Sequence, residues 1–469
     1  MISVANKDWQ KIIERVYKYD QEQVFRFWDE LNEDQRGRLL AQLNKVDFEL
    51  LKKLYVQSKN EQHSVNIRLQ QAEIITLKQR EISDKEVLPR GEQTLKNGQV
   101  AAFLVAGGQG SRLGFDGPKG MYPVTPVKHK SLFQNQAEKL RALAQKYGNT
   151  IPWYIMTSRT NHTQTVEYFE KEKYFGYPSS KIKFFMQDML AAVDYNGKLI
   201  LDEKDHIFES PNGHGGSIKA LWDSGALKEM EENGVKYIFY FQVDNALVNI
   251  CDPYYLGYHI SNEAQISNKV VHKVNAEEKM GVICKINGKT GVMEYSDLDE
   301  ADMYAVDEKG RLKYWGGNTA VHIFSVDFIR MENERGFRLP YHIAHKSIPY
   351  LNEKGEKIKP QGKNGLKFET FVFDAMADAD RVTTIEIKRE EEFSALKNKE
   401  GADSPETVLR DQLKLFASWF SLADVKVPLN DQGLPKVKLE ISPLFALNAQ
   451  ELKEKKEVIP AVEADLYLG

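Results

Sequence analysis

Residues 100–124 read VAAFLVAGGQGSRLGFDGPKGMYPV, an apolar run that breaks directly into a series of glycines. A short apolar run followed by glycines is typical of a strand buried in a parallel sheet. Gly107, Gly108 and Gly110 allow positive φ angles and let several backbone N–H groups point toward one place, which makes a cradle for an anion. The segment therefore predicts a phosphate-binding loop at the end of a sheet strand.

The same loop carries two cations, Arg112 and Lys119. Arginine can hold two phosphate oxygens at once and lysine acts as a point charge, so the expected ligand is a nucleoside polyphosphate. A P-loop would need G-x-x-x-x-G-K-[ST], but Lys119 is preceded by proline and followed by Gly120. A nicotinamide-dependent oxidoreductase would need G-x-G-x-x-G, and the spacing from Gly108 to Gly114 is one residue too long.

Strand-like and helix-like segments alternate along the chain on both sides of residue 160. Short apolar runs predict strands at residues 152–158, 181–187 and 236–244, and helical spacing predicts helices at 131–146, 162–173 and 217–234. This alternation predicts a doubly wound α/β fold, in which helices cover both faces of a largely parallel sheet.

Three regions of the chain differ in character. Residues 1–95 are rich in charge, poor in glycine and proline, and repeat apolar residues at helical spacing, which predicts an N-terminal helical cap. Residues 96–380 carry the glycine loop and the alternating segments, with an antiparallel or mixed section from about residue 265, and are expected to form the catalytic domain. Residues 381–469 combine strand-like and helical segments and predict a small C-terminal α+β domain.

Composition narrows the class of protein. The chain has 469 residues, 42% of them apolar and 28% charged, which is typical of a globular protein with more than one domain. The net charge of -4 argues against a broad surface for nucleic acid or anionic membrane. Only two cysteines occur, and no apolar run approaches about 18 residues. The N-terminal segment is too polar for a signal peptide, so we expect a cytoplasmic protein that binds neither nucleic acid nor membrane.

An acidic residue ends one of the expected strands. Asp244 closes the apolar run FYFQVD and is followed by Asn245. A carboxylate at the carboxyl end of a parallel strand lies where α/β sheets bind ligands, and Mg²⁺ prefers one or two carboxylates together with water and phosphate oxygens. The residues alone leave two interpretations open, a magnesium site or an aspartate that caps the following turn.

Several motifs in the same order carry a family resemblance. GGQGSRLG at residues 107–114 and PKGMY at 118–122 are followed by WYIMTS, KYFGY, FFMQDMLAA, VDNALVNICDP, GNTAVHIF, KFETFVFD and EEEFSALKN. This pattern resembles the eukaryotic-type UDP-sugar pyrophosphorylases over roughly residues 95–400, and is most similar to the UDP-N-acetylglucosamine enzymes. The resemblance implies a doubly wound mixed sheet of nucleotide-diphospho-sugar transferase type, which is Rossmann-like.

The resemblance also implies an activity, its cofactor and its partners. The expected enzyme is a uridylyltransferase that converts UTP and a sugar 1-phosphate into a UDP-sugar and pyrophosphate, with Mg²⁺ or Mn²⁺ as cofactor. We expect the protein to be a monomer or a weak homo-oligomer.

Residue roles follow from the same resemblance. Arg112 is expected on the β- and γ-phosphates, Lys119 on the α-phosphate and Lys397 on the incoming sugar phosphate, while Asp244 holds the metal. The substrate-binding residues that the resemblance implies are Ala106, Gly107, Gly108, Gln187, Gly213, His214, Asp244, Gly281, Glu294, Asn318 and His322. Gln187 would read the uracil together with the loop backbone, because a carboxamide both donates and accepts. Ordinary turn or strand-end roles stay open for the residues expected at the sugar, and a buried core position stays open for His322.

One position departs from the pattern. His214, in the second glycine cluster PNGHGGS, stands where the N-acetylglucosamine enzymes are expected to carry asparagine. A histidine between these glycines is similar to the UDP-glucose and broad-specificity UDP-sugar pyrophosphorylases. N-acetylglucosamine 1-phosphate is therefore the expected substrate, and glucose or galactose 1-phosphate is the alternative. A non-catalytic UDP-sugar-binding protein is the alternative of another class, against which the presence of Arg112, Lys119 and Asp244 argues.

Overall fold

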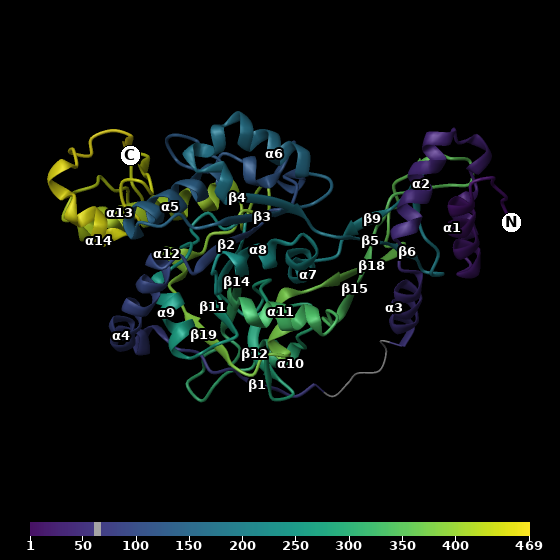
Figure 1. Cartoon of the computed structure of the whole chain (residues 1–469). Helices are drawn as coiled ribbons and strands as arrows, with labels where there is room; N and C mark the ends of the chain where they lie inside the picture. The colour runs from purple at the N-terminus through teal and green to yellow at the C-terminus, as the bar shows by residue number, and fades with distance from the viewer. Residues whose placement is uncertain (61–66) are drawn as a thin grey trace. The chain divides into compact units, whose positions relative to one another are not determined.

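The computed structural model describes residues 1–60 and 67–469, and the chain divides into two compact units (Figure 1). The first unit comprises Met1–Ile67, Gln187–Ser217 and Leu339–Asp374. The second unit comprises Arg68–Met186, Ile218–Arg338 and Ala375–Gly469. Each unit is assembled from three separate segments, so its core depends on contacts between residues far apart in sequence.

The first unit is built from amphipathic helices and short strands. Its named elements are α1 (Lys7–Lys18), α2 (Glu33–Lys45), α3 (Phe48–Asn60), β5 (Met189–Ala191), β6 (Val193–Asp194), β7 (Leu201–Glu203), β8 (His206–Ile207), β9 (Glu209–Pro211), β15 (Tyr341–Lys346), β16 (Tyr350–Leu351), β17 (Lys357–Ile358) and β18 (Gly365–Thr370). α1 begins after Asn6, whose side chain accepts hydrogen bonds from two N–H groups of the first turn. The apolar faces of the helices pack against the sheet β15-β18-β6, with Leu39, Leu43 and Phe368 in the shared core.

A mixed sheet of ten strands organises the second unit. One side of the sheet consists of four parallel strands in the order β10 (Tyr237–Gln242), β2 (Val100–Val105), β3 (Trp153–Thr157) and β4 (Ile182–Met186), with β4 at the edge. β2, β3 and β10 are buried along nearly their whole length, which is why each reads as a continuous apolar run. The four strands expected from these runs are confirmed.

The rest of the sheet is largely antiparallel, as expected for the section that begins near residue 265. β14 (Gly316–Ser325) runs antiparallel to β10 and also pairs with β11 (Ile266–His272) and β12 (Val282–Ile286). The remaining strands are β1 (Leu69–Gln71) and β13 (Lys289–Met293), which pair with β12, and β19 (Val382–Glu386), which is parallel to β11. The prediction of a mixed α/β sheet is confirmed.

Helices connect and cover these strands. They are α4 (Leu77–Lys96), α5 (Leu132–Tyr147), α6 (His162–Lys171), α7 (Gly216–Asp223), α8 (Ala226–Glu232), α9 (Pro253–Ser261), α10 (Glu300–Met303), α11 (Val326–Glu334) and α12 (Arg389–Glu392). The single helix expected at residues 217–234 is wrong, because Gly225 takes a φ of 70° and separates α7 from α8. α4 and α9 approach closely at glycines: a Cβ on Gly91 would lie 1.8 Å from the Pro253 carbonyl oxygen, and one on Gly257 would lie 2.2 Å from that of Val87.

The C-terminal elements form a small cluster within the second unit. They are α13 (Pro405–Leu422), β20 (Leu439–Ile441), α14 (Ala449–Glu454) and β21 (Leu466–Leu468), with Phe420, Leu439 and Leu452 in their core. α13 and α14, drawn in yellow, lie beside α5 in Figure 1. Lys146 of α5 donates a hydrogen bond to Glu451 of α14 at 2.8 Å. No helix in the described ranges has the length and apolar character needed to cross a bilayer.

Candidate active site

The glycine loop follows β2 directly, and the turn after β3 holds it in place. The Asn161 side chain donates to the carbonyl oxygen of Ala106 at 2.8 Å, and the Ser158 hydroxyl donates to that of Gly107 at 2.9 Å. The N–H groups of Gly107 and Gly108 have no acceptor in the part of the chain that the structure describes. The loop therefore has fixed carbonyls and two unengaged donors, which is what an anion cradle requires.

Lys119 and Asp244 face each other at the carboxyl ends of β2 and β10. The Lys119 Nζ lies 3.6 Å from the Asp244 Oδ2, and the two side chains are 17% and 15% exposed. The strands pair in parallel with Gln242 opposite Val105, so the residues that follow them emerge at the same sheet edge. Lys119 also borders the loop, because a Cβ on Gly108 would lie 3.9 Å from its Cε. The structure thus gathers one cation, one carboxylate and the donor loop in one place.

An aromatic ring anchors the turn that carries Lys119. A Cβ on Gly120 would lie 2.1 Å from the Phe133 ring, so only glycine fits at that position. The Phe133 ring packs against Phe169 with centroids 5.0 Å apart, and the Lys119 N–H donates to the Gly108 carbonyl at 3.1 Å. Because both ends of the turn are fixed, the lysine starts from a defined backbone position.

Residues 393–403, which we call the strap, bring a second lysine to the same edge. The N–H of Leu396 donates to the carbonyl oxygen of Asp244 at 2.9 Å, and Lys397 is the next residue. The Lys397 Nζ lies 3.4 Å from the Asp403 Oδ2, and both side chains are 40% exposed. Arg112 is exposed in the short turn Ser111–Leu113 of the glycine loop.

Three of the expected sugar-binding residues lie together where β12 and β14 meet. The N–H of Asn318 donates to the carbonyl oxygen of Gly281 at 2.8 Å. A Cβ on Gly281 would lie 2.8 Å from the Glu294 Oε1, so a side chain at residue 281 would displace the carboxylate. The pairing of β12 with β14 explains how residues distant in sequence form this group.

His322 lies within β14. Its side chain is fully buried, its Nδ1 is 2.8 Å from the Asn268 Oδ1, and its ring packs near Tyr240. This is the core position that the sequence left open as the second interpretation. Gln187 is the first residue after β4 and is 8% exposed.

The second glycine cluster, in the first unit, places His214 in a ring stack. The His214 and Phe371 rings stack at 5.2 Å, and the His342 ring stacks on Phe371 at 4.3 Å. The His214 Nδ1 accepts a hydrogen bond from the Val372 N–H at 3.1 Å, so the proton of the neutral ring is on Nε2. Burial lowers the pKa of His214 to about 4, so the ring stays neutral at pH 7 and offers one fixed N–H donor. Gly213 is required here, because at its φ of 82° a Cβ would lie 2.3 Å from the Thr370 carbonyl oxygen.

The metal ligands that the site offers suit a magnesium ion that also binds the substrate. Within the described ranges, no group of three or more His, Cys, Asp or Glu side chains is arranged to hold a metal. Asp244 supplies one partly exposed carboxylate at the sheet edge. Mg²⁺ is commonly bound through one or two carboxylates, with phosphate oxygens and water completing its shell, so this single carboxylate fits such an ion.

The residues that position this site give almost no signal in the sequence. Asn245 donates from its Nδ2 to the Glu392 carbonyl at 2.8 Å, and its Oδ1 accepts from the Ser394 N–H at 3.1 Å. Asn245 therefore attaches the strap to the end of β10. Its position next to Asp244 was the one signal in the sequence that could have indicated this role. Ser158 and Asn161 lie about 50 residues from the loop that they hold, and nothing in the sequence indicated that contact.

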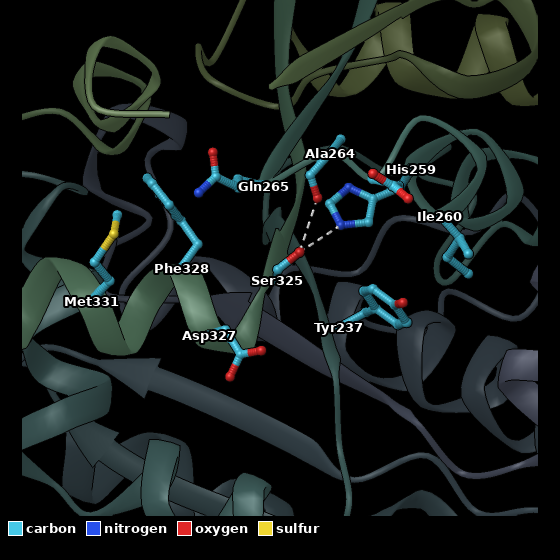
Figure 2. A pocket seen from close by; sticks show the side chains of 10 residues that line it. Tyr237, His259, Ile260, Ala264, Gln265, Ser325, Asp327, Phe328 and Met331 are labelled. Atoms are coloured by element: carbon cyan, nitrogen blue, oxygen red, sulfur yellow. Dashed lines mark hydrogen bonds between the residues drawn. The ribbon is translucent and has the colours of Figure 1, made fainter. Parts of the chain in front are cut away.

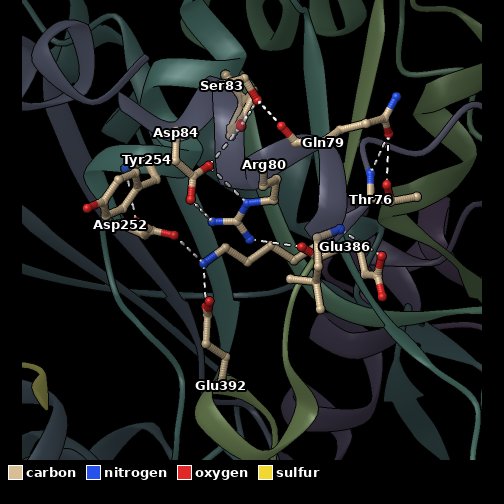
Figure 3. Close-up of polar contacts among 12 residues, drawn as sticks. Thr76, Gln79, Arg80, Ser83, Asp84, Asp252, Tyr254, Glu386 and Glu392 are labelled. Atoms are coloured by element: carbon tan, nitrogen blue, oxygen red, sulfur yellow. Dashed lines mark hydrogen bonds and ion pairs between the residues drawn. The ribbon is translucent and has the colours of Figure 1, made fainter. Parts of the chain in front are cut away.

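A buried charge network includes Glu392, the residue directly before the strap (Figure 3). Lys269, 1% exposed, donates to Asp252 at 2.7 Å and also to Glu392, the residue before the strap. Burial alone would lower the pKa of Lys269, but the carboxylates of Asp252 and Glu392 outweigh burial and raise it, so the lysine stays charged. Arg80 of α4 pairs with Asp84 at 3.1 Å in the same view. The network therefore fixes where the strap begins.

A cavity of about 400 Å³ lies at the opposite edge of the sheet (Figure 2). The cavity borders Tyr237, the first residue of β10, whereas Asp244 lies just beyond the carboxyl end of the same strand. The His259 Nδ1 lies 2.7 Å from the Ser267 Oγ, and its Nε2 lies 3.1 Å from the Ser325 Oγ. Ligands of open α/β sheets bind at the carboxyl ends of strands, so this cavity is not a candidate active site.

The buried imidazole should make stability depend on pH. Burial lowers the pKa of His259 from 6.5 to about 3, so below pH 6.5 the unfolded chain binds a proton that the folded chain does not. The contribution of His259 to the free energy of unfolding is therefore fully present above pH 6.5. It decreases by about 1.4 kcal/mol per pH unit as the pH drops from 6.5 toward 3. We expect urea unfolding at pH 7.5 and 5 to show a loss that the His259→Asn variant lacks. An equal loss in both proteins would contradict the assignment.

Comparison with known proteins identifies relatives that match this chain along most of its length. Residues 46–462 match the UTP–glucose-1-phosphate uridylyltransferase family. UDP-N-acetylhexosamine pyrophosphorylase-like protein 1 of Xenopus tropicalis is 36% identical over 94% of this chain and 92% of that protein. UDP-N-acetylglucosamine pyrophosphorylase of Saccharomyces cerevisiae is 37% identical over 75% of this chain and 76% of that protein.

Solved structures give the same result. The crystal structure of a putative UDP-N-acetylglucosamine pyrophosphorylase from Entamoeba histolytica is 36% identical, with a TM-score of 0.75 over 86% of this chain and 99% of that one. That of the uridine diphosphate N-acetylglucosamine pyrophosphorylase from Trypanosoma brucei is 25% identical, with a TM-score of 0.84 over 100% and 99%. The family match, the sequence relatives and the fold agree, and the chain belongs to the UTP–glucose-1-phosphate uridylyltransferase family.

Proposed function

We propose that this protein is a UDP-sugar pyrophosphorylase that makes UDP-N-acetylglucosamine and pyrophosphate from UTP and N-acetylglucosamine 1-phosphate. The observation that carries the proposal is the pairing of Lys119 with Asp244, 3.6 Å apart, beside the donor loop at the carboxyl ends of two adjacent parallel strands. The choice of sugar nucleotide is supported by relatives that are 35–37% identical to this chain and are named as UDP-N-acetylglucosamine pyrophosphorylases.

The reaction depends on positive side chains that neutralise the phosphate groups, and less on proton transfer. A phosphate oxygen of the sugar 1-phosphate attacks the α-phosphorus of UTP, and the bond from that phosphorus to the β-bridging oxygen breaks as pyrophosphate leaves. The attacking oxygen is already an anion, so no general base is required. We assign Lys119 to the α-phosphate, Arg112 to the β- and γ-phosphates that become the leaving group, and Lys397 to the incoming phosphate.

Asp244 is the residue that would hold Mg²⁺ or Mn²⁺. The metal, when bound, neutralises charge on the phosphate oxygens. Within the protein, the 3.6 Å contact with Lys119 keeps the carboxylate oriented toward the same place as the lysine. This arrangement lets one edge of the sheet align the charges of both reacting phosphates.

Specificity for the base and the sugar is proposed to come from residues outside the phosphate site. Gln187 is proposed to hydrogen-bond the imide edge of uracil, since its carboxamide offers one donor and one acceptor side. Gly281, Glu294 and Asn318 are proposed to contact the sugar, because an amide, a carboxylate and a close backbone turn suit hydroxyl and acetamido groups. We further propose that the protein works in the cytoplasm as a monomer or a weak homo-oligomer.

The proposal is tested by measuring pyrophosphate release from UTP with a panel of sugar 1-phosphates. We expect the highest kcat/KM with N-acetylglucosamine 1-phosphate. Preference for glucose or galactose 1-phosphate would replace the sugar assignment by the alternative that His214 favours. Calorimetric binding of a UDP-sugar without any turnover would instead identify a non-catalytic binding protein.

His214 offers a sharper test of sugar choice. His214→Asn removes an imidazole from the stack with Phe371 and leaves space for a larger substituent on the sugar. We expect the ratio of kcat/KM for N-acetylglucosamine 1-phosphate over glucose 1-phosphate to rise about tenfold, the effect of a small change in pocket size. His206→Asn, in the same unit but outside the stack, is the control. A ratio unchanged in both variants would remove His214 from sugar recognition.

A further inference from the structure

Lys399 is a third lysine that the strap brings to the glycine loop. A Cβ on Gly114 would lie 3.6 Å from the Lys399 Cδ and 3.8 Å from its Cε. The methylene chain of the lysine therefore lies against the loop, and its ammonium, one bond farther along, is beside the segment that carries Arg112. Gly114 has a φ of 71°, which favours glycine and leaves that face of the loop open to the lysine.

The strap holds Lys399 there through its backbone. The Ala246 N–H donates to the Ser394 carbonyl at 3.0 Å, which fixes the beginning of the strap to the strand end. The N–H groups of Lys397 and Asn398 both donate to the carbonyl oxygen of Asp403, at 2.7 and 3.0 Å, and close the strap into a compact turn. The position of Lys399 is thus set by hydrogen bonds on both sides of it.

The three lysines near the glycine loop differ in whether a carboxylate pairs with them. Lys119 is paired with Asp244 and Lys397 with Asp403, whereas Lys399 has no carboxylate within 4.0 Å in the described ranges. Its side chain is exposed. A lysine whose stem rests on the glycine loop at Gly114, and which has no carboxylate partner in the described ranges, is suited to neutralise a ligand.

We propose that Lys399 is a further phosphate-binding residue, which engages the pyrophosphate half of UTP in the forward reaction and free pyrophosphate in the reverse reaction. The inference rests on the proposed function, because that function places the β- and γ-phosphates of UTP, which leave as pyrophosphate, at the glycine loop. Arg112 holds two phosphate oxygens in a fixed geometry, whereas Lys399 adds a point charge on a flexible stem. The two cations share a dianionic end of the ligand that neither neutralises alone.

The test is a calorimetric titration of inorganic pyrophosphate, with magnesium, into the full-length protein. We expect Lys399→Met to weaken pyrophosphate binding about five- to tenfold, the effect of one partly screened charge, and to leave UMP binding unchanged. Lys399→Arg should retain most of the affinity. Lys414→Ala removes an exposed lysine on α13 and is the matched control.

Steady-state kinetics provide the second measurement. The KM values for UTP and pyrophosphate should rise in Lys399→Met, while the KM for the sugar 1-phosphate stays within twofold of its original value. Pyrophosphate affinity within twofold of the unmodified protein, or an equal loss of UMP binding, would overturn the assignment of Lys399. Failure of the unmodified protein to release pyrophosphate with any sugar 1-phosphate would overturn the proposed function instead, and the titration does not depend on turnover.

Discussion

Lys119→Ala should lower kcat/KM for UTP by about 10²- to 10³-fold, or roughly 3–4 kcal/mol of transition-state stabilisation, the loss seen when one positioned donor is removed. The Lys119 side chain is only 17% exposed and its ammonium lies 3.6 Å from Asp244. The same change leaves Asp244 without its partner. Because Lys119 is proposed to contact the α-phosphate, we expect kcat to fall more than the affinity for UTP.

The measurement is pyrophosphate release under single-turnover and steady-state conditions. Lys78→Ala, an exposed lysine at the start of α4, is the control and should retain full activity. Asp244→Asn should also reduce the rate, and the double variant should lose less than the sum, because the two side chains act on one another. Near-normal kcat in Lys119→Ala would show that the loop lysine is not part of the reaction.

Lys269→Met should destabilise the folded protein by about 3–5 kcal/mol, the loss expected when one partner of a buried charge pair is removed. The change leaves the carboxylates of Asp252 and Glu392 buried together without a cation. Urea unfolding at pH 7.5 measures the loss. Lys285→Met, which breaks a partly exposed pair with Glu73, should cost less than about 1 kcal/mol and is the control.

One further variant and a change of pH separate charge from packing at Lys269. Glu392→Gln added to Lys269→Met should restore part of the stability, because it removes one of the two unpaired carboxylates. Lowering the pH to 5 should also narrow the difference between Lys269→Met and the unmodified protein, since burial raises the pKa of Glu392 and favours its neutral form. A difference below 1 kcal/mol at pH 7.5 would mean that the network does not hold the strap.

The parallel half of the sheet could be predicted from sequence because its signals are local. β2, β3 and β10 are apolar runs that end in glycine or polar residues, and burial on both faces produces that pattern. The glycine loop adds its own signal, since its glycines and cations are contiguous. The single expected helix at 217–234 failed because a left-handed glycine at residue 225 ended it within an otherwise helical pattern.

The support of the site could not be predicted, because it depends on long-range contacts. Asn245 meets Glu392, and Lys399 meets Gly114, over separations that no periodicity records. The burial of His322 in β14 was likewise open until its strand neighbours were known. Sequence patterns specify which residues carry charge, whereas strand order and the path of the strap decide which charges meet.

The attachment of the strap to the strand end also bears on how the protein is synthesised. The glycine loop is translated well before residues 393–403, and at about 5–20 residues per second the interval between them is on the order of 15–60 s. During that time a nascent chain has the loop but neither Lys397 nor Lys399 beside it. Since both lysines are proposed to bind phosphate, we expect nucleotide binding to become possible only late in synthesis. Chains that end before the strap should lack uridylyltransferase activity.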